Sequence, residues 1–496
     1  MTPNVPQPPR ELDREACFEA FLAHDPRFDG RFFVSNKLTG IYCRPICRAH
    51  FSRPDNFDFH LSAAAAEAKG YRPCLKCRPE IAPGLSPAEA GPRLARRAAL
   101  LIERDFLFES SLADLARSLG LTSRHLRRVF DAEFGVSPVQ YLQTRKLLLA
   151  KNLLTDTNLP ITQIAFAAGF SSLRRFNDLF KQRYRLAPSS FKKDNTSLKK
   201  TLDGATLLLA YRPPYQWPSI LEFLAGRAMA GVEEVADNSY RRVVRIQDSA
   251  TYYGWIKVSD RPEKKALAVT VAPGLLPVLP RVLARVRTLF DTDCDPCRIY
   301  DKLRVMNEFV KPGACLPGTR LPGAFDPFEM AVRAILGQQI TVKAARTLAG
   351  RLTRTLGTPV TTPFAELTHA FPQPRDLLSL GKPIADHLGP LGITGARCRS
   401  ILALASAIEL EHIHLDMTAD PEQMMERLLE LPGFGPWTAQ YVAMRALSYP
   451  DAFPHTDYGL KKALAPRPAR EVAALSEQWR PWRSYAAINL WNSLNH

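Results

Sequence analysis

The chain has 496 residues, and its 66 lysines and arginines against 49 acidic residues give a formal net charge of +17 at pH 7. This length exceeds what one hydrophobic core usually organises, which excludes a single small domain and predicts three or four domains. The positive charge favours a polyanionic partner, because lysines and arginines that neutralise phosphates release counterions, although charge alone also suits ribosomal or membrane-surface proteins.

The N-terminal residues have neither the basic start nor the apolar core of a signal peptide. No later stretch is uniformly apolar over the length that a bilayer requires. We therefore expect a cytoplasmic protein with no membrane partner. Four of the nine cysteines lie in two tight pairs, which in a reducing compartment indicates metal ligation more readily than disulfides.

The two pairs are Cys43-x3-Cys47 and Cys74-x2-Cys77. Each pair can supply two sulfurs to one tetrahedral ion, so Cys43, Cys47, Cys74 and Cys77 are the predicted ligands of a single zinc ion. A purely structural zinc knuckle is the alternative interpretation, since most four-thiolate sites only hold a fold together.

The residues around these cysteines are Gly40-Ile-Tyr-Cys-Arg-Pro-Ile-Cys47 and Ala68-Lys-Gly-Tyr-Arg-Pro-Cys-Leu-Lys-Cys-Arg-Pro79. They resemble the zinc domain of the bacterial Ada methylation-response proteins, over roughly Glu11 to Pro83. The resemblance implies that Cys43 is both a ligand and the acceptor of a methyl group from a methylphosphotriester in DNA.

The chemistry of four thiolates supports this role. Zinc with four thiolates carries a net charge of about −2, so each sulfur is an electron-rich, soft nucleophile. A methyl phosphotriester is neutral and can approach, whereas a phosphodiester is repelled. Methylated Cys43 is a neutral thioether, so we expect DNA affinity to rise after transfer. The side chains expected to hold the flanking phosphates are Arg44, Arg48, Arg72, Lys76 and Arg78.

The basic charge is concentrated between Arg93 and Lys193, where 18 lysines and arginines stand against 8 acidic residues. Apolar residues recur there at spacings of three and four, which predicts helices throughout. Residues 111–130 and 161–180 each predict a helix, a Gly-containing turn and a second helix. The exposed candidates for DNA contact are Arg124, Arg127 and Arg128 in the first copy and Arg174, Arg175 and Asn177 in the second.

A single helix-turn-helix pattern is often only two packed helices, but a double copy with basic second helices is more specific for DNA. The two copies, with Phe134-Gly-Val-Ser-Pro-Val-Gln-Tyr-Leu-Gln-Thr-Arg145 between them, resemble the AraC-type regulator domain. This resemblance implies an all-α domain that binds double-stranded DNA and works with RNA polymerase.

The pattern changes at Leu207 to short branched or aromatic runs, which predict a mixed α/β subdomain. Its predicted strands are Leu207–Tyr211, Arg242–Ile246, Tyr252–Val258 and Ala266–Val271. From about Phe325 the pattern is helical again.

Within this last segment, Leu431-Pro-Gly-Phe-Gly-Pro-Trp-Thr-Ala-Gln-Tyr441 predicts a helix, a glycine hairpin and a second helix. Gly433 and Gly435 let the backbone turn tightly and point its amides at a DNA phosphate, and a monovalent cation often accompanies such a hairpin. Asp457 follows at a predicted helix start.

The hairpin and the aspartate resemble the base-excision glycosylase superfamily. Phe328-Glu-Met-Ala-Val-Arg-Ala-Ile-Leu-Gly-Gln-Gln339 and Arg480-Pro-Trp-Arg-Ser-Tyr485 are similar to the AlkA-like 3-methyladenine glycosylases, from roughly Thr201 to the end. By that resemblance Asp457 is the catalytic carboxylate and residues 333–339 lie against DNA. An isolated aspartate there would more often be a helix cap beside core tryptophans. The implied base-binding residues are Trp437, Tyr441, Trp491 and Gln338.

These residue types suit the implied reaction. An N-alkylated purine is cationic, so aromatic faces attract it and its glycosidic bond needs little acid assistance. Asp457 would stabilise the oxocarbenium-like sugar and orient water. Relatives that also cut the strand have a lysine where this chain has Trp437, so we predict a monofunctional glycosylase. Gln339 stands where an apolar wedge is expected to fill the gap of the flipped base.

Two motifs are absent from the sequence. No four-cysteine cluster follows Asp457, so no iron–sulfur centre is expected. No Pro-Cys-His-Arg motif occurs, so no O6-methylguanine transferase domain is expected.

Together the patterns predict a multidomain, mainly α protein with α+β parts. The expected domains are a zinc-binding methyl acceptor at 8–84, a double helix-turn-helix domain at 93–195, an α/β subdomain at 201–317 and an all-α helix-hairpin-helix domain at 318–496. We expect a monomeric alkylation sensor and transcription activator fused to an alkylpurine glycosylase, acting at the bacterial nucleoid. The alternatives are a regulator without catalysis and a glycosylase whose helix-turn-helix domain only loads it onto DNA.

Overall fold

The computed structural model describes residues 13–48, 53–84, 94–105, 111–192, 204–308, 310, 315–416 and 419–494. It divides into two compact units. Unit 1 comprises residues 1–200, 205–212 and 279–281, and unit 2 comprises 201–204, 213–278 and 282–496. The predicted domain limits at 8, 93, 195 and 201 fall outside the described residues.

The N-terminal part of unit 1 is a small four-stranded sheet in the order β3-β1-β2-β4. Strand β1 pairs antiparallel with β2 and β3, whereas β2 and β4 run parallel. Buried Phe21, Phe32, Val34 and Phe57 pack on one another and form its core. The elements are α1 (Arg14–Leu22), β1 (Phe33–Asn36), β2 (Ile41–Cys43), β3 (Phe57–His60), α2 (Ala63–Ala68) and β4 (Arg72–Pro73).

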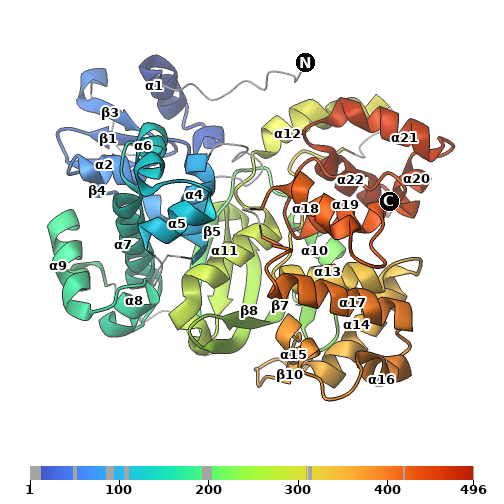
Figure 1. Cartoon of the computed structure of the whole chain (residues 1–496). Helices are drawn as coiled ribbons and strands as arrows, with labels where there is room; N and C mark the ends of the chain where they lie inside the picture. Colours follow the sequence, from blue (N-terminus) through green and yellow to red (C-terminus); the bar gives the residue numbers. More distant parts are fainter. Residues whose placement is uncertain are drawn as a thin grey trace. The chain divides into compact units, whose positions relative to one another are not determined.

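The remainder of unit 1 is mainly helical and contains the two predicted helix-turn-helix pairs. Both turns use glycine in the left-handed region, Gly120 at φ +67° and Gly169 at φ +88°, which L side chains rarely adopt. Figure 1 shows the long helix α7 between the two pairs. The elements are α4 (Leu94–Asp105), α5 (Leu112–Ser118), α6 (Ser123–Phe134), α7 (Pro138–Asp156), α8 (Ile161–Ala167), α9 (Leu173–Tyr184) and β5 (Ala205–Ala210).

Unit 2 begins with helix α10 and an antiparallel run of strands, in the order β9-β8-β7-β6. The predicted strand Ala266–Val271 is confirmed with the same bounds, whereas Arg242–Ile246 and Tyr252–Val258 are longer because they form one continuous hairpin of nine paired positions. The fourth predicted strand, Leu207–Tyr211, corresponds to β5 of unit 1, which begins two residues earlier and ends one residue earlier. The sequence did not predict β6. The elements are α10 (Trp217–Ala225), β6 (Glu233–Ala236), β7 (Ser239–Gln247), β8 (Thr251–Arg261) and β9 (Ala266–Val271).

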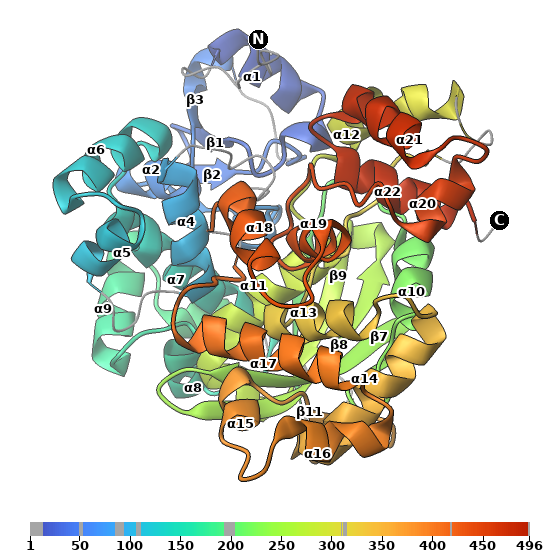
Figure 2. The same ribbon diagram turned by 45° about the vertical axis from the view of Figure 1, so that its right-hand side comes forward.

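The rest of unit 2 is helical, apart from a short pair of strands. Figure 2 shows the neighbouring helices α18 and α19, which form the predicted helix-hairpin-helix. Among the described helices, none combines the length and the apolar character that a membrane crossing requires. The elements are α11 (Leu279–Phe290), α12 (Pro296–Leu303), α13 (Pro327–Leu336), α14 (Val342–Leu356), β10 (Thr358–Pro359), β11 (His369–Ala370), α15 (Pro374–Leu378), α16 (Ile384–Leu388), α17 (Gly395–Glu409), α18 (Pro421–Leu429), α19 (Pro436–Arg445), α20 (Tyr458–Ala463), α21 (Ala469–Ser476) and α22 (Arg483–Asn492).

Candidate active site and candidate metal centre

The four predicted zinc ligands lie together because of the parallel pairing of β2 and β4. Cys43 is the last residue of β2 and Cys74 follows β4, so the ends of the two strands bring them side by side. The backbone N–H of Cys74 donates to the Tyr42 carbonyl oxygen at 2.9 Å. All four sulfurs lie within 4.8 Å of one another. Zn–S bonds of 2.3 Å in a tetrahedron place sulfurs roughly 3.8 Å apart, so this set fits one zinc ion.

The four sulfurs are not equivalent. Cys47 is 1% exposed and Cys74 is 6% exposed, whereas Cys43 and Cys77 are partly exposed. Backbone N–H groups donate to the Cys77 sulfur from Arg44 at 3.3 Å and to the Cys74 sulfur from Lys76 at 3.4 Å. No such donor reaches Cys43 from the described residues. A hydrogen bond withdraws electron density from a thiolate. Cys47 also lacks such a donor among the described residues but is buried, so Cys43 is the accessible sulfur without a backbone hydrogen bond.

The structure corrects the expectation for Arg44. This side chain is buried, forms an ion pair with Asp29 and donates to the Cys77 carbonyl oxygen at 3.1 Å. Arg78 is likewise engaged, by ion pairs with Glu80 and Asp156. The Arg44 guanidinium therefore supports the zinc module from inside and does not face a DNA phosphate, whereas Arg78 is partly exposed but engaged in ion pairs. The predicted phosphate-binding residues that are at least partly exposed and form no ion pair with another described residue are Arg48, Arg72 and Lys76.

The predicted DNA-reading residues lie on the second helix of each helix-turn-helix pair. In α6, which Thr122 caps, the side chains of Arg124, Arg127 and Arg128 are exposed. In α9, which Ser172 caps, Arg174 and Arg175 are exposed and Asn177 is partly buried. Both helices present cations in their N-terminal halves, which is where recognition helices contact base edges.

Buried carboxylates that the sequence did not single out join the zinc module to α7 and α9. Glu80 forms an ion pair with Lys151 at 2.6 Å, and both side chains are 0% exposed. Glu67 accepts hydrogen bonds from the hydroxyls of Tyr42 at 3.0 Å, Thr144 at 2.9 Å and Tyr184 at 3.2 Å. In the sequence, Glu67 and Glu80 look like any acidic residue of a short helix. Only the tertiary structure shows that they are buried and bind residues of α7 and α9.

The glycine hairpin of unit 2 is held by Gln338. Gly433 has φ +80°, and a Cβ there would lie 2.2 Å from the Ser400 hydroxyl oxygen, so only glycine fits. Gly435 caps α19 in an extended conformation. The Gln338 amide nitrogen donates to the Gly433 carbonyl oxygen at 2.8 Å and to the Thr438 hydroxyl at 2.9 Å. The Gln338 amide therefore positions the hairpin, and its contact with the base stays a prediction.

Gln339 lies at the tip of the turn after α13. It is exposed and has φ +58°, in the left-handed region that non-glycine residues rarely adopt. The surrounding turn therefore projects this side chain away from the body of unit 2.

Asp457 caps helix α20 and is also held by two tryptophans. Its Oδ1 accepts from the Leu460 N–H at 3.1 Å and from the Trp491 indole N–H at 2.9 Å. Its Oδ2 accepts from the Trp437 indole N–H at 3.0 Å. The helix cap and the tryptophan contacts therefore occur together, and three donors fix the orientation of a partly exposed carboxylate.

The two tryptophans belong to a continuous group of aromatic rings, which we call the aromatic cage: Phe223, Trp437, Tyr441 and Trp491. Trp437 stacks on Tyr441 with ring centroids 5.2 Å apart and planes 7° apart. Trp491 lies 6.1 Å from Tyr441 and 6.4 Å from Phe223. The sequence did not single out Phe223, because an aromatic residue on the apolar face of α10 resembles any core residue. Tyr458, which follows Asp457, is 78% exposed.

Two arginines face the aromatic cage. Arg445 donates to the Tyr441 hydroxyl oxygen at 3.0 Å, and the Arg227 guanidinium carbon lies 3.7 Å from the Phe223 ring centroid. Burial alone would raise the pKa of Tyr441, but the positive charges of Arg445, Arg227 and Arg333 outweigh burial and lower that pKa below its usual value.

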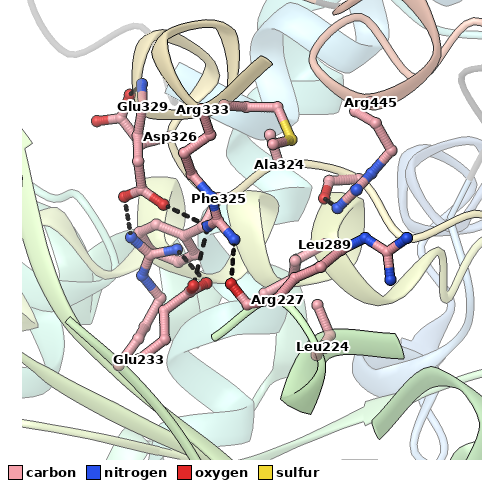
Figure 3. Close-up of a pocket in the computed structure, with 13 residues that line it drawn as sticks. Leu224, Arg227, Glu233, Leu289, Ala324, Phe325, Asp326, Glu329, Arg333 and Arg445 are labelled. Atoms are coloured by element: carbon pink, nitrogen blue, oxygen red, sulfur yellow. Dashed lines mark hydrogen bonds and ion pairs between the residues drawn. The ribbon is translucent and has the colours of Figure 1, made fainter. Parts of the chain in front are cut away.

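Behind these arginines lies a buried ionic network, drawn in Figure 3. Arg333 pairs with Glu233 at 2.9 Å and with Glu329 at 3.1 Å, and Arg242 pairs with Glu329 at 2.7 Å. Arg333 was expected to lie against DNA as the start of the 333–339 segment. The structure corrects this expectation, because two buried carboxylates hold its guanidinium inside unit 2.

Three family models match the chain. The metal binding domain of Ada matches residues 16–80, a helix-turn-helix domain matches residues 115–194, and the AlkA N-terminal domain matches residues 206–326.

Three proteins illustrate the similarity. A Mycobacterium tuberculosis protein described as a probable bifunctional transcriptional activator/DNA repair enzyme AlkA is 37% identical over 494 residues, which cover 98% of this chain and 97% of that protein. DNA-3-methyladenine glycosylase 2 of Escherichia coli is 35% identical over 283 residues, 57% of this chain and 95% of that protein. The bifunctional transcriptional activator/DNA repair enzyme Ada of Escherichia coli is 35% identical over 134 residues, 27% of this chain and 36% of that protein.

Proposed function

This chain belongs to the AlkA family of bifunctional transcriptional activators and DNA repair enzymes, and from that premise we propose that it excises alkylated purines of the 3-methyladenine type and accepts methyl groups on Cys43. The observation that carries the first activity is the Asp457 carboxylate, held by the indole N–H groups of two rings of the aromatic cage. The catalytic group and the base-binding surface are thus parts of one arrangement.

In the proposed excision, the damaged base leaves the DNA stack and enters the aromatic cage, whose faces attract its positive charge. The bond between C1′ and the base nitrogen breaks, and its electron pair neutralises the cationic base. The Asp457 carboxylate stabilises the positive charge that develops on the sugar and takes a proton from the water that adds to C1′. Trp437 occupies the hairpin position of a lyase lysine, which supports hydrolysis without strand cleavage.

The test of this mechanism is Asp457→Asn. Asparagine is also a good helix cap, so α20 should form while the negative charge is lost. We expect release of 3-methyladenine from methylated DNA to fall at least ~100-fold, with DNA binding retained. Asp295→Asn changes another helix cap of unit 2 in the same way and serves as the control. Unchanged excision by the Asp457 variant would refute the assignment and leave a regulator without catalysis.

The second activity rests on the exposure of Cys43 beside three buried or hydrogen-bonded partner cysteines. Zinc, when bound by Cys43, Cys47, Cys74 and Cys77, keeps their sulfurs deprotonated at neutral pH. The Cys43 sulfur attacks the methyl carbon, an S–C bond forms, the C–O bond breaks, and the phosphodiester leaves as an anion. Arg48, Arg72 and Lys76 supply positive charge for the neighbouring phosphates.

Mass spectrometry after incubation with methylated DNA tests this step. We expect one methyl group on the peptide that contains Cys43 and none on the peptide with Cys74 and Cys77. A zinc-loaded protein that stays unmethylated would leave only a structural metal site. Cys315→Ser, at a buried cysteine far from the four ligands in sequence, is the control variant.

We also propose that methylation of Cys43 converts the protein into a transcription activator that reads DNA with α6 and α9 and contacts RNA polymerase as a monomer. The exposed arginines of both helices support DNA reading. The proposal has two further parts. A monovalent cation binds at the carbonyls of the hairpin. The Gln339 side chain inserts into the gap that the flipped base leaves in the duplex. Promoter footprinting before and after methylation checks the switch, and equal occupancy would leave the helix-turn-helix pairs only a loading role.

A further inference from the structure

One wall of the aromatic cage carries positive charge. The Arg227 guanidinium carbon lies 3.7 Å from the Phe223 ring centroid and 6.0 Å from the Trp491 ring centroid. The Arg445 guanidinium carbon lies 4.8 Å from the Phe223 centroid and 5.8 Å from the Tyr441 centroid. Two cations therefore already occupy faces that would attract a cationic base.

The nearby carboxylates neutralise other arginines. Glu233 and Glu329 pair with Arg333 and Arg242. Within the described part of the chain, no ion pair joins a carboxylate to Arg227 or Arg445. Figure 3 shows the Arg227 side chain extending away from the Glu233 carboxylate. The two guanidiniums at the cage wall are therefore not ion-paired, although the Asp457 carboxylate adds a negative charge to the cage through Trp437 and Trp491.

The two arginines differ in what they can offer a ligand. Arg445 is buried, and its guanidinium donates to the carbonyl oxygens of Pro322 and Gly323 and to the Tyr441 hydroxyl. Arg227 is partly exposed; its guanidinium donates to the Phe223 carbonyl oxygen at a long 3.3 Å and also interacts with the Tyr441 hydroxyl, which leaves several of its five N–H groups for a ligand. Arg227 is thus the guanidinium with hydrogen-bonding capacity to spare.

We propose that Arg227 is a specificity-determining residue, which allows the aromatic cage to process uncharged purines by donating hydrogen bonds to an oxygen or ring nitrogen of the flipped base. This inference rests on the proposed glycosylase activity. Arg227 would then determine how fast the protein excises neutral bases relative to cationic bases.

Charge balance explains the direction of the effect. When a neutral purine leaves, the electron pair of the C1′–N9 bond stays on the base, which becomes anionic until it receives a proton. A guanidinium hydrogen bond stabilises that developing charge in a cage with little water. The water that adds to C1′ gives its proton to Asp457, from which it returns to the released base, so the net reaction is hydrolysis.

A cationic alkylpurine leaves as a neutral molecule, so Arg227 has no developing negative charge to stabilise. Instead it repels the bound base before the bond breaks. Tyr441 reinforces the preference, because its oxygen accepts from Arg445 and its own proton remains available to the base. The arginine charges that lower the pKa of Tyr441 make it a stronger hydrogen-bond donor.

Single-turnover excision by the full-length zinc-loaded protein tests the inference. The two probes are duplexes with one hypoxanthine, which is neutral, or one N7-methylguanine, which is cationic. For Arg227→Met we expect hypoxanthine release to fall about 10-fold or more, and N7-methylguanine release to rise. Arg227→Lys should recover part of the hypoxanthine release, because it restores the charge.

Arg346→Met is the matched control. Arg346 is exposed and donates to the carbonyl oxygen of Ala225, the last residue of helix α10 and two residues before Arg227, with no contact to the aromatic cage among the interactions of the described residues. Equal changes for both probes in Arg227→Met, or no hypoxanthine release by the unaltered protein, would overturn the inference. Failure of the unaltered protein to release N7-methylguanine would instead overturn the proposed glycosylase function.

Discussion

At the scale of single residues, the candidate active site depends on a glycine that carries no functional group. A Cβ at Gly459 would lie 2.9 Å from Trp491 ring carbon Cδ1 and 3.0 Å from Asp457 Oδ1. Carbon atoms at such separations overlap, so a larger residue must displace the indole or the carboxylate. The distance between Asp457 and Trp491 therefore requires glycine at position 459.

We predict that Gly459→Ala lowers excision by roughly 10-fold or more, since a displacement of about 1 Å at a catalytic group can cost 100-fold. The reduction should appear in the single-turnover rate, with DNA affinity little changed. Gly381→Ala is the control, because no atom lies within 4 Å of the Cβ at that position. A Gly459→Ala protein as active as the control would show that the carboxylate tolerates displacement.

The buried carboxyl of Glu67 makes the stability of unit 1 depend on pH. Burial raises the pKa of this carboxyl from 4.5 to about 7, against the lowering effect of hydrogen bonds from Thr144, Tyr42 and Tyr184. Because the folded-state pKa lies above the unfolded value, the folded protein binds the proton more tightly. The contribution to stability is therefore present below pH 4.5 and is lost as the pH rises to 7.

We predict that Glu67→Gln removes this dependence and stabilises unit 1 above pH 7 by roughly 3 kcal/mol, since the pKa rises from 4.5 to about 7 and each pKa unit corresponds to about 1.4 kcal/mol. Amide hydrogen exchange in α2 and α7 of the zinc-loaded protein measures the effect, with variant and parent compared at each pH. Slower exchange of the variant at pH 8 and similar exchange at pH 5 is the expected result. Faster exchange of the variant at pH 5 and at pH 8 would contradict the prediction. It would mean that the ionised Glu67 carboxylate is needed to hold the hydroxyls of Tyr42, Thr144 and Tyr184 in place.

At the scale of elements, helix α7 is the support to which the zinc module is attached. Lys151 of α7 and Glu80 form a fully buried ion pair, and Arg78 reaches Asp156 at the end of the same helix. Breaking one partner of a buried pair is costly, because the other charge remains without water.

We predict that Lys151→Met destabilises unit 1 by about 3 kcal/mol, near the lower end of the usual range because Arg78 still pairs with Glu80. The exposed pair of Arg117 and Asp114 provides the control, and Arg117→Met should cost less than about 1 kcal/mol. Hydrogen exchange of α7 compares the two variants. Equal effects would show that the zinc module does not depend on this pair.

At the scale of the whole molecule, each candidate site is built from residues of one unit. The four cysteines belong to unit 1, and Asp457 and the aromatic cage belong to unit 2. The two proposed activities therefore need no shared residue.

We predict that the activities separate by mutation. Cys43→Ser should abolish methyl acceptance and leave excision of 3-methyladenine within about twofold, since distant independent sites have nearly additive effects. Asp457→Asn should do the reverse. Removal of zinc by a chelator should follow the pattern of Cys43→Ser. A variant that loses both activities would show that the units depend on each other for function.

The sequence by itself determined the features that rest on short spacing. The two cysteine pairs, the helix-turn-helix copies and the glycine hairpin each lie within a few residues or a few turns, where backbone geometry and ligand chemistry leave few alternatives. Asp457 was singled out through the resemblance of the hairpin and the following helix start to the glycosylases, and its catalytic role stays a proposal. These features were enough to predict the fold class and the zinc site.

Only the tertiary structure decided which charged and aromatic side chains face a site. Arg44 is buried against Asp29, 15 residues away, and Arg333 pairs with Glu233, 100 residues away. Gln338 holds the hairpin, and Arg227 reaches the aromatic cage from the turn after α10. A sequence displays charge and hydrophobicity but not the partner on the other side of a contact. That partner determines whether an arginine meets DNA, a buried acid or a flipped base.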